Sequence, residues 1–175
     1  MSSVASTIAI NQIGVVVKNL DEAMESYWRT AGIGPWNIYS TGAPPLVSEY
    51  HGRPVNYKIR LATAKSGLVQ IELIEYASGD TIHRDFLASG RTGVEHLGIY
   101  VADLDQALQT YQDRNIAILQ RADGMGLKGD GRYAYLDTEP ILGTILELIQ
   151  SSSQPIPPER VYPENYQPKR KDMQK

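Results

Sequence analysis

The feature that most constrains the fold of this chain is an internal repeat. The stretch NQIGVVVKNLDEAMESY, which begins at Asn11, returns in altered form as VEHLGIYVADLDQALQTY over residues 94–111. A second related pair, YKIRLATAKSGLVQIELI and RYAYLDTEPILGTILELI, spans residues 57–74 and 132–149. Such repeats indicate that a chain is built from copies of one structural module. The matched residues include Gly14 with Gly98, Leu20 with Leu104, Asp21 with Asp105, Tyr27 with Tyr111 and Leu73 with Leu148.

Each copy predicts a strand, a helix and three further strands, in the order β-α-β-β-β. In the first copy, Asn19 is the expected N-cap of the helix LDEAMESYWRTAG, and Gly32 is its expected end. A connector with one short helix is expected between the copies, and the glycine-rich stretch ADGMGLKGDGR is expected to be a mobile loop. The expected strands are 8–17, 36–39, 56–62 and 68–76, then 95–101, 116–120, 133–137 and 143–150, and the second helix is expected over 104–114.

Polar residues occupy corresponding positions on strands that are otherwise apolar. Gln12 corresponds to His96, and Glu72 corresponds to Glu147. Because side chains alternate between the two faces of a strand, each glutamate alone could simply face solvent. If the two modules pair about a pseudo-twofold axis, however, the four residues can converge as one imidazole, two carboxylates and one amide oxygen. This set suits zinc, cobalt, nickel or manganese, with coordination positions left open for water or substrate.

Composition excludes several other classes of protein. The net charge of −3 gives no basic face for nucleic acid and no general attraction to a membrane surface. The absence of cysteine excludes disulfides and any thiolate metal site. The N-terminal residues lack the pattern of a signal peptide, and no apolar run is long enough to span a bilayer, so a cytoplasmic protein is expected.

Taken together, the repeat and the four polar positions resemble the vicinal oxygen chelate superfamily, over roughly Ile8 to Gln150. This superfamily includes glyoxalase I, methylmalonyl-CoA epimerase, extradiol dioxygenases and bleomycin-resistance proteins. The resemblance implies an α+β fold, in which two βαβββ modules form an open, cupped mixed sheet with flanking helices. It also implies metal ligands at Gln12, Glu72, His96 and Glu147. The expected domain covers residues 1–155, with module one at about 8–76, a connector at 77–93 and module two at about 94–150, followed by a proline-rich tail over 151–175.

This chain departs from the characteristic residues of several members of the superfamily, and these departures distinguish the possible activities. Glyoxalase I enzymes commonly have an arginine and an asparagine four residues beyond their first two ligands, where this chain has Val16 and Tyr76. Extradiol dioxygenases use two histidines and one carboxylate on iron, but the first ligand position here is Gln12. Epimerases place a second glutamate base in the region that reads YKIRLA here, where Lys58 or a neighbour stands.

The chemistry that remains is proton transfer beside a carbonyl group. By analogy with the glyoxalases, Glu147 is expected to take the proton, and Lys58, Glu49, His51 or a tyrosine could return it from another face. Eleven tyrosines against one phenylalanine favour a pocket for a cyclic or aromatic oxygenated compound. The residues expected to bind substrate are Trp36, Tyr39, Tyr57, Arg60, Tyr76, Arg132 and Tyr135.

The sequence therefore predicts a divalent-metal-dependent isomerase or epimerase acting on a small-molecule substrate. Zinc is the first expectation for the metal, with nickel, cobalt and manganese as alternatives. A glyoxalase-type lyase and a metal-free binding or resistance protein are the alternative functions. The resemblance also implies a homodimer, and it allows the two modules to pair within one chain or across the dimer.

Overall fold

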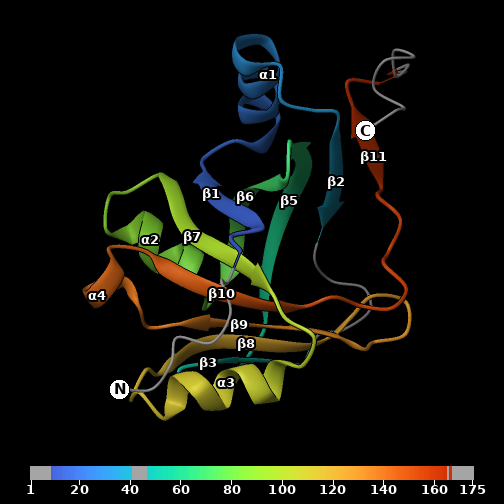
Figure 1. The fold of residues 1–175 in the computed structure, drawn as a ribbon. Coiled ribbons are helices and arrows are strands. Elements are labelled where there is room, and N and C mark those ends of the chain that lie inside the picture. The colour runs from blue at the N-terminus through green and yellow to red at the C-terminus, as the bar shows by residue number, and fades with distance from the viewer. Residues whose placement is uncertain (1–8, 41–46, 165, 167–175) are drawn as a thin grey trace.

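The computed structural model describes residues 9–40, 47–164 and 166, and their strands form one mixed sheet (Figure 1). The sheet has eleven strands in the order β11-β2-β5-β6-β1-β7-β10-β9-β8-β3-β4. Four helices accompany the sheet, so the α+β fold with an open sheet is confirmed. The elements are β1 (Gln12–Val17), α1 (Leu20–Ala31), β2 (Trp36–Ser40), β3 (Val47–Tyr50), β4 (Arg53–Val55), β5 (Tyr57–Ser66), β6 (Val69–Gly79), α2 (Ile82–Ala88), β7 (Gly93–Tyr100), α3 (Leu104–Gln112), β8 (Ile118–Met125), β9 (Gly131–Leu136), α4 (Glu139–Leu142), β10 (Ile145–Gln150) and β11 (Arg160–Tyr162).

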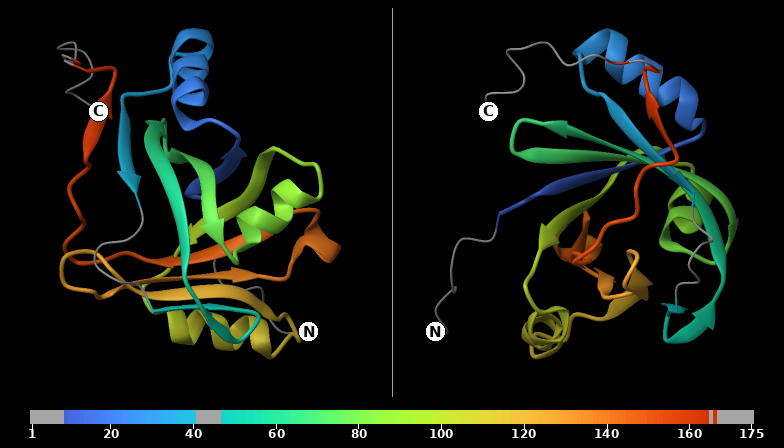
Figure 2. Two further views of the ribbon diagram at one scale, coloured as in Figure 1. Left: turned by 180° about the vertical axis from the view of Figure 1, so that it is seen from behind. Right: turned by 90° about the vertical axis from the view of Figure 1, so that its right-hand side faces the viewer.

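The two modules meet inside one chain, where their first strands pair. β1 runs antiparallel to β7, while each of these strands runs parallel to the last strand of its own module, β6 or β10. The strands of module one cross those of module two at a large angle, and the sheet curls around the space between them (Figures 1 and 2). The pseudo-twofold arrangement expected from the repeat therefore forms without a second chain.

The helix of each module begins at a polar cap and packs on its own core. The side chain of Asn19 accepts a hydrogen bond from the backbone N–H of Glu22 at 3.1 Å, and Asp103 accepts one from Gln106 at 3.0 Å. Gly32 ends α1 in the left-handed conformation, as its position predicted.

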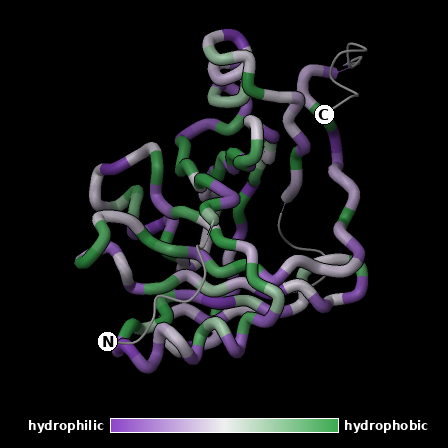
Figure 3. Tube along the Cα trace, in the orientation of Figure 1, coloured by the Kyte–Doolittle hydropathy of each residue, from purple (hydrophilic) through white to green (hydrophobic). Residues whose placement is uncertain are grey.

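Two separate apolar clusters lie beneath the helices, one around Leu20, Met24 and Trp36 and the other around Leu104, Leu108 and Leu136. Hydrophobic and hydrophilic residues alternate along many strands, as expected for a sheet with two different faces (Figure 3).

Several stretches depart from the elements expected from sequence. Residues 47–55, expected to be part of an extended loop, form the β3–β4 hairpin, which pairs with β8 of module two. The glycine-rich stretch 122–132, expected to be a mobile loop, lies largely in strands, because β8 continues to Met125 and β9 begins at Gly131. In the expected tail, β11 pairs with β2 at the opposite edge of the sheet.

Candidate metal centre

The four residues expected to bind metal lie on the four central strands, β6, β1, β7 and β10. The strand register places Gly14 between Glu72 on β6 and His96 on β7. It also places Gly98 between Gln12 on β1 and Glu147 on β10. Since directly opposed residues of neighbouring strands share a face of the sheet, all four side chains emerge on one face.

The repeated glycines provide the space that these side chains occupy. A Cβ atom at Gly14 would overlap the imidazole ring of His96, and a Cβ atom at Gly98 would lie 2.7 Å from Oε1 of Gln12. Gln12 of module one therefore lies against Gly98 of module two, and His96 of module two lies against Gly14 of module one. This contact is a physical reason for the repeated patterns QIG and HLG in the sequence.

The imidazole of His96 lies between the two glutamates. Its Nε2 is 3.2 Å from Oε2 of Glu147 and 3.7 Å from Oε2 of Glu72, and the ligand atoms of all three residues lie within 4.8 Å of one another. His96 Nε2, Glu147 Oε2 and Gln12 Oε1 are all buried without a hydrogen-bond partner among the described residues. Buried polar atoms normally have partners, so three such atoms in one cluster indicate a group that binds there.

The other ring nitrogen of His96 has a buried carboxylate as its partner. Oε2 of Glu95 lies 3.1 Å from Nδ1 of His96 and 2.7 Å from Nδ1 of His83. Burial would raise the pKa of Glu95, but the charges and hydrogen bonds of the two histidines outweigh it and lower the pKa to about 2. An Nδ1–H of His96 donated to Glu95 leaves Nε2 facing Glu72 and Glu147, which is the usual support of a metal-binding histidine.

Without a bound cation, the cluster favours a proton on His96. Burial opposes a charge on the ring, but the nearby Glu147 carboxylate, followed by Glu72 and Glu95, raises the pKa of His96 well above its usual value. Burial also raises the pKa of Glu147, although His96 works in the opposite direction. The shift at His96 reflects the carboxylates around its ring, and the same carboxylates would favour a cation at Nε2.

A cavity of about 150 Å³ opens on this cluster. Tyr135 forms part of its wall, and the centre of its ring lies 5.0 Å from that of His96. Among the described residues that line the cavity, none is lysine or arginine. The lining residues are Gln12, Tyr57, Ile59, Leu61, Glu72, Ile74, His83, Tyr100, Met125, Tyr133, Tyr135, Glu147 and Ile149.

Of the residues expected to bind substrate, Tyr57 and Tyr135 line this cavity. Tyr39 pairs with the lining residue Leu61 across β2 and β5 but does not itself line the cavity. Tyr76 also lies outside the lining, and its hydroxyl donates to the carbonyl of Gly79 at 3.1 Å.

The other three expected substrate-binding residues make their contacts outside the cavity. Trp36 is fully buried in the core beneath α1, with its ring 5.8 Å from that of Tyr27. Arg60 pairs with Asp21 at 2.9 Å and Glu75 at 3.3 Å. Arg132 pairs with Asp123 and, at 2.7 Å, with Asp105, so neither arginine lies in the cavity.

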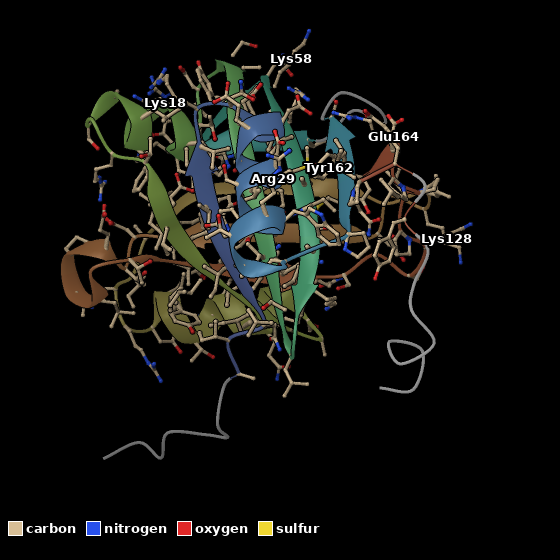
Figure 4. All side chains as sticks on the ribbon, turned by 90° about the horizontal axis from the view of Figure 1, so that it is seen from above. Lys18, Arg29, Lys58, Lys128, Tyr162 and Glu164 are labelled. Carbon is tan, nitrogen blue, oxygen red and sulfur yellow. The ribbon has the colours of Figure 1, made fainter. Side chains whose placement is uncertain are left out.

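Two of the residues expected to return the proton also lie outside the cavity. Lys58 is exposed at the periphery of the molecule (Figure 4). It follows Tyr57, which lines the cavity, and adjacent strand residues point to opposite faces. His51 lies exposed in the turn between β3 and β4, with a positive φ of 48° and its ring 4.3 Å from that of Tyr50. Neither residue therefore lines the cavity.

Sequence reasoning missed the residues that support the cluster from behind. Glu95 and His83 are 2% and 1% exposed, and Gln120, at 1%, is another buried polar residue. The available signal was Glu95 itself, a charged residue beside the expected ligand His96 in a strand. His83 and Gln120 join the site only through tertiary packing, which no local pattern reveals.

Comparison with known proteins assigns the family. The model of the glyoxalase/bleomycin resistance protein/dioxygenase superfamily matches residues 11–135, so the chain belongs to this superfamily. The uncharacterized protein YqjC of Bacillus subtilis (strain 168) is 22% identical over 142 residues, which cover 81% of this chain and 91% of that protein.

Solved structures agree at the level of the fold. A methylmalonyl-CoA epimerase of Streptomyces coelicolor, in complex with 2-nitronate-propionyl-CoA, is 24% identical with a TM-score of 0.61, covering 87% of this chain and 100% of that chain. The methylmalonyl-CoA epimerase of Mycobacterium tuberculosis is 18% identical with a TM-score of 0.62, covering 86% of this chain and 93% of that chain.

None of the described helices is long and apolar enough to cross a membrane.

Proposed function

We propose that this protein is a divalent-metal-dependent isomerase or epimerase, which transfers a proton next to a carbonyl group of a small, uncharged, ring-sized substrate. The observation that carries the proposal is the group of buried atoms Gln12 Oε1, His96 Nε2 and Glu147 Oε2, which make no hydrogen bond among the described residues and lie beside Glu72. As an extension of the proposal, the protein forms a homodimer, as the family resemblance implies, and acts in the cytoplasm, as the sequence pattern predicts.

The donor atoms fit a divalent cation. Gln12, Glu72, His96 and Glu147 would hold it through one nitrogen and three oxygens, a set that suits zinc, nickel, cobalt or manganese. The two carboxylates would balance its charge. When bound, such an ion polarises a carbonyl oxygen and stabilises the charge that develops as the neighbouring carbon loses a proton.

Glu147 is the proposed proton acceptor, and its carboxylate would accept the proton when it is not bound to the cation. It lines the cavity, and its Oε2 is buried without a hydrogen-bond partner. Glu72, the other carboxylate of the cluster, is less buried, with 14% of its side chain exposed against 6% for Glu147. A carboxylate that is more buried is a stronger base than one that is more exposed to solvent, because it is less solvated before it accepts the proton.

The wall of the cavity supports the substrate class. It combines tyrosine rings with the aliphatic residues Ile59, Leu61, Ile74 and Ile149, and none of its described residues carries a lysine or arginine charge. Among the described residues, a carboxylate or phosphate group placed away from the cation would find no lysine or arginine side chain to pair with. An uncharged ring with oxygen substituents matches both the apolar and the polar parts of the wall.

The first experiment measures the metal content of protein purified without added metal, for the wild type and for Glu72→Ala and His96→Ala. We expect close to one ion per chain in the wild type and loss of that ion in both variants. Glu22→Ala on the exposed N-terminal turn of α1 is the matched control for the glutamate. His51→Asn is the control for the histidine, since asparagine tolerates the positive φ at this turn.

The second experiment follows the exchange of carbon-bound hydrogen in deuterated water, with cyclohexanone and its hydroxylated derivatives as probes. Metal-dependent exchange that disappears in Glu147→Gln is the expected result. Bound metal without exchange of any probe would contradict the proton-transfer proposal. Failure of the wild type to bind zinc, nickel, cobalt or manganese would contradict the metal site and favour a binding protein that uses the tyrosine-lined cavity.

A further inference from the structure

A pair of tyrosine hydroxyls joins the two modules across the cavity. Tyr57 comes from β5 of module one and Tyr133 from β9 of module two, and four strands separate β5 from β9 in the sheet. Their hydroxyl groups nevertheless contact each other in a hydrogen bond, and both residues line the cavity that contains Glu72 and Glu147. The hydroxyl pair, meaning the phenolic oxygens of Tyr57 and Tyr133, therefore lies where the curled sheet brings its two halves together.

Surrounding groups hold one end of the hydroxyl pair in a fixed direction. The carbonyl oxygen Oε1 of Gln120 accepts from the backbone N–H of Ile82 at 3.0 Å, which orients the amide so that Nε2 donates to the hydroxyl of Tyr133 at 3.5 Å. The two phenols carry two hydroxyl protons, and the bond between them uses one. The second proton remains for another acceptor, either the Ser48 hydroxyl that also bonds Tyr57 or an oxygen of a molecule in the cavity.

Both phenols keep their protons in this environment. Burial raises the pKa of Tyr133 well above its usual value, and the contact with Tyr57 and the charge of Glu147 act in the same direction. Burial also raises the pKa of Tyr57, although its hydrogen bonds with Tyr133 and Ser48 work against the shift. The hydroxyl pair is therefore a neutral hydrogen-bond donor and not a general base.

We infer that the hydroxyl pair of Tyr57 and Tyr133 is a substrate-binding site, which donates a hydrogen bond to a second oxygen of the substrate while the reacting carbonyl faces Glu72, His96 and Glu147. This inference rests on the proposed function and narrows its substrate to an uncharged ring that carries at least two oxygen groups. Tyr135 supplies an aromatic wall between the two polar ends, because its ring lies 5.3 Å from that of Tyr133 and 5.0 Å from that of His96.

The test compares cyclohexanone with 2-, 3- and 4-hydroxycyclohexanone as probes for the metal-loaded protein. Dissociation constants are measured by NMR titration for the wild type, Tyr57→Phe, Tyr133→Phe and the double variant. At least one hydroxylated probe should bind the wild type about fivefold to tenfold more tightly than cyclohexanone, the usual effect of one neutral hydrogen bond. Tyr57→Phe and the double variant should lose this preference and bind cyclohexanone as the wild type does.

Tyr27→Phe is the matched control, because Tyr27 packs on Trp36 in the core beneath α1 and does not line the cavity. The preference for the hydroxylated probe should survive in this variant. Circular dichroism and metal content must be unchanged in the single variants, which separates lost recognition from lost folding. A variant that fails to fold is replaced by Tyr57→Met or Tyr133→Met, which lack both the hydroxyl and any other hydrogen-bond donor.

The result also separates this inference from the proposed function. Suppose that the protein binds one metal ion per chain and catalyses hydrogen exchange, but the wild type and Tyr57→Phe prefer the hydroxylated probe over cyclohexanone equally. This result would overturn the inference and leave the proposed function intact. If the wild type binds no metal, the proposed function fails, and the same titrations on the metal-free protein decide the inference, since hydroxyl donation needs no ion. No preference for any hydroxylated probe, or no binding of any probe, would overturn it.

Discussion

The two modules place corresponding residues at the candidate site, but they build unequal halves. Module two contributes His96 and Glu147, which are 0% and 4% exposed. Module one contributes Gln12, also buried, and the more accessible Glu72. The groups that hydrogen-bond to His96 and Gln12 differ as well. The charged Glu95 holds the ring of His96, whereas the amide of Gln12 donates to the neutral side chain of Gln70 at 3.0 Å.

This difference indicates a division of labour within a symmetric backbone. In module two, a buried carboxylate orients the imidazole, so the His96 half is fixed before a cation binds. In module one, a neutral amide contact holds Gln12, and Glu72 lies closer to solvent, so that half can adjust with little cost. We therefore expect module two to provide most of the affinity for metal, and module one to tune it.

The largest expected effect is on zinc affinity, when the first polar residue of each module is removed. His96→Ala should weaken zinc binding by at least ~100-fold, and Gln12→Ala by roughly 10-fold, because His96 supplies the only nitrogen of the set and has the stronger support. Competition with a chromophoric chelator measures both affinities. Equal losses in the two variants would show that the halves contribute alike.

The next largest effect concerns the two glycines under these residues. Gly14→Ala would drive a Cβ atom into the imidazole ring of the fully buried His96, whereas Gly98→Ala meets Oε1 and Cβ of Gln12 at 2.7 and 2.8 Å. Overpacking of a buried site commonly costs about 1–3 kcal/mol, and we expect Gly14→Ala to lie at the upper end of this range.

Urea unfolding of the metal-free variants measures the two losses of stability. Gly98→Ala should lose less, because its shortest contacts, at 2.7 and 2.8 Å, are longer than those of Gly14→Ala, and because Oε1 of Gln12 can rotate away while the ring of His96 is held by Glu95. The exposed Gly52, whose added Cβ would meet no atom within 4 Å, provides a third variant that reports the effect of its positive φ alone. A larger loss for Gly98→Ala than for Gly14→Ala would reverse the proposed order of rigidity.

Much of the fold could be predicted because its signals are local or repeated. Helix α1 has its cap at Asn19 and its end at Gly32 within a single stretch of sequence, and both were identified correctly. The β3–β4 hairpin was missed for the opposite reason. Its strands hold only four and three residues, and β3 finds its partner in β8, far along the chain. Glycines in 122–132 suggested a loop, although pairing of β8 with β9 keeps much of this stretch in strands.

The site could be predicted only as far as the repeat reaches. The repeat located the four polar residues that the central strands bring to one face. The repeat gave no information about which other strand residues face the cavity. Lys58 and Arg60 were therefore expected at the site, although they alternate with the cavity residues Tyr57, Ile59 and Leu61. Strict alternation along β5 would have excluded both. Glu95 stands beside His96 in sequence, yet its contact with His83 depends on how α2 packs on the sheet.

The smallest expected effect is on the pH dependence of zinc binding. Nearby carboxylates, Glu147 above all, outweigh burial and raise the pKa of His96 well above its usual value, which favours a proton on the ring when no metal is present. Zinc must displace this proton. Zinc affinity should therefore rise up to about tenfold per pH unit as pH increases, and level off once the pH exceeds the pKa of His96.

Gln12→His tests whether this proton belongs to module two alone. Gln12 cannot titrate, so the wild type should release one proton from the imidazole of His96 on binding zinc. A second imidazole at position 12 should add a second proton at low pH and make the dependence of zinc affinity on pH steeper there. Calorimetry in buffers of different ionisation enthalpy counts the protons released, with His51→Asn as the control that removes a histidine outside the site. An unchanged proton count in Gln12→His would mean that position 12 lies outside the ligand set, and that the cation is held by Glu72, His96 and Glu147.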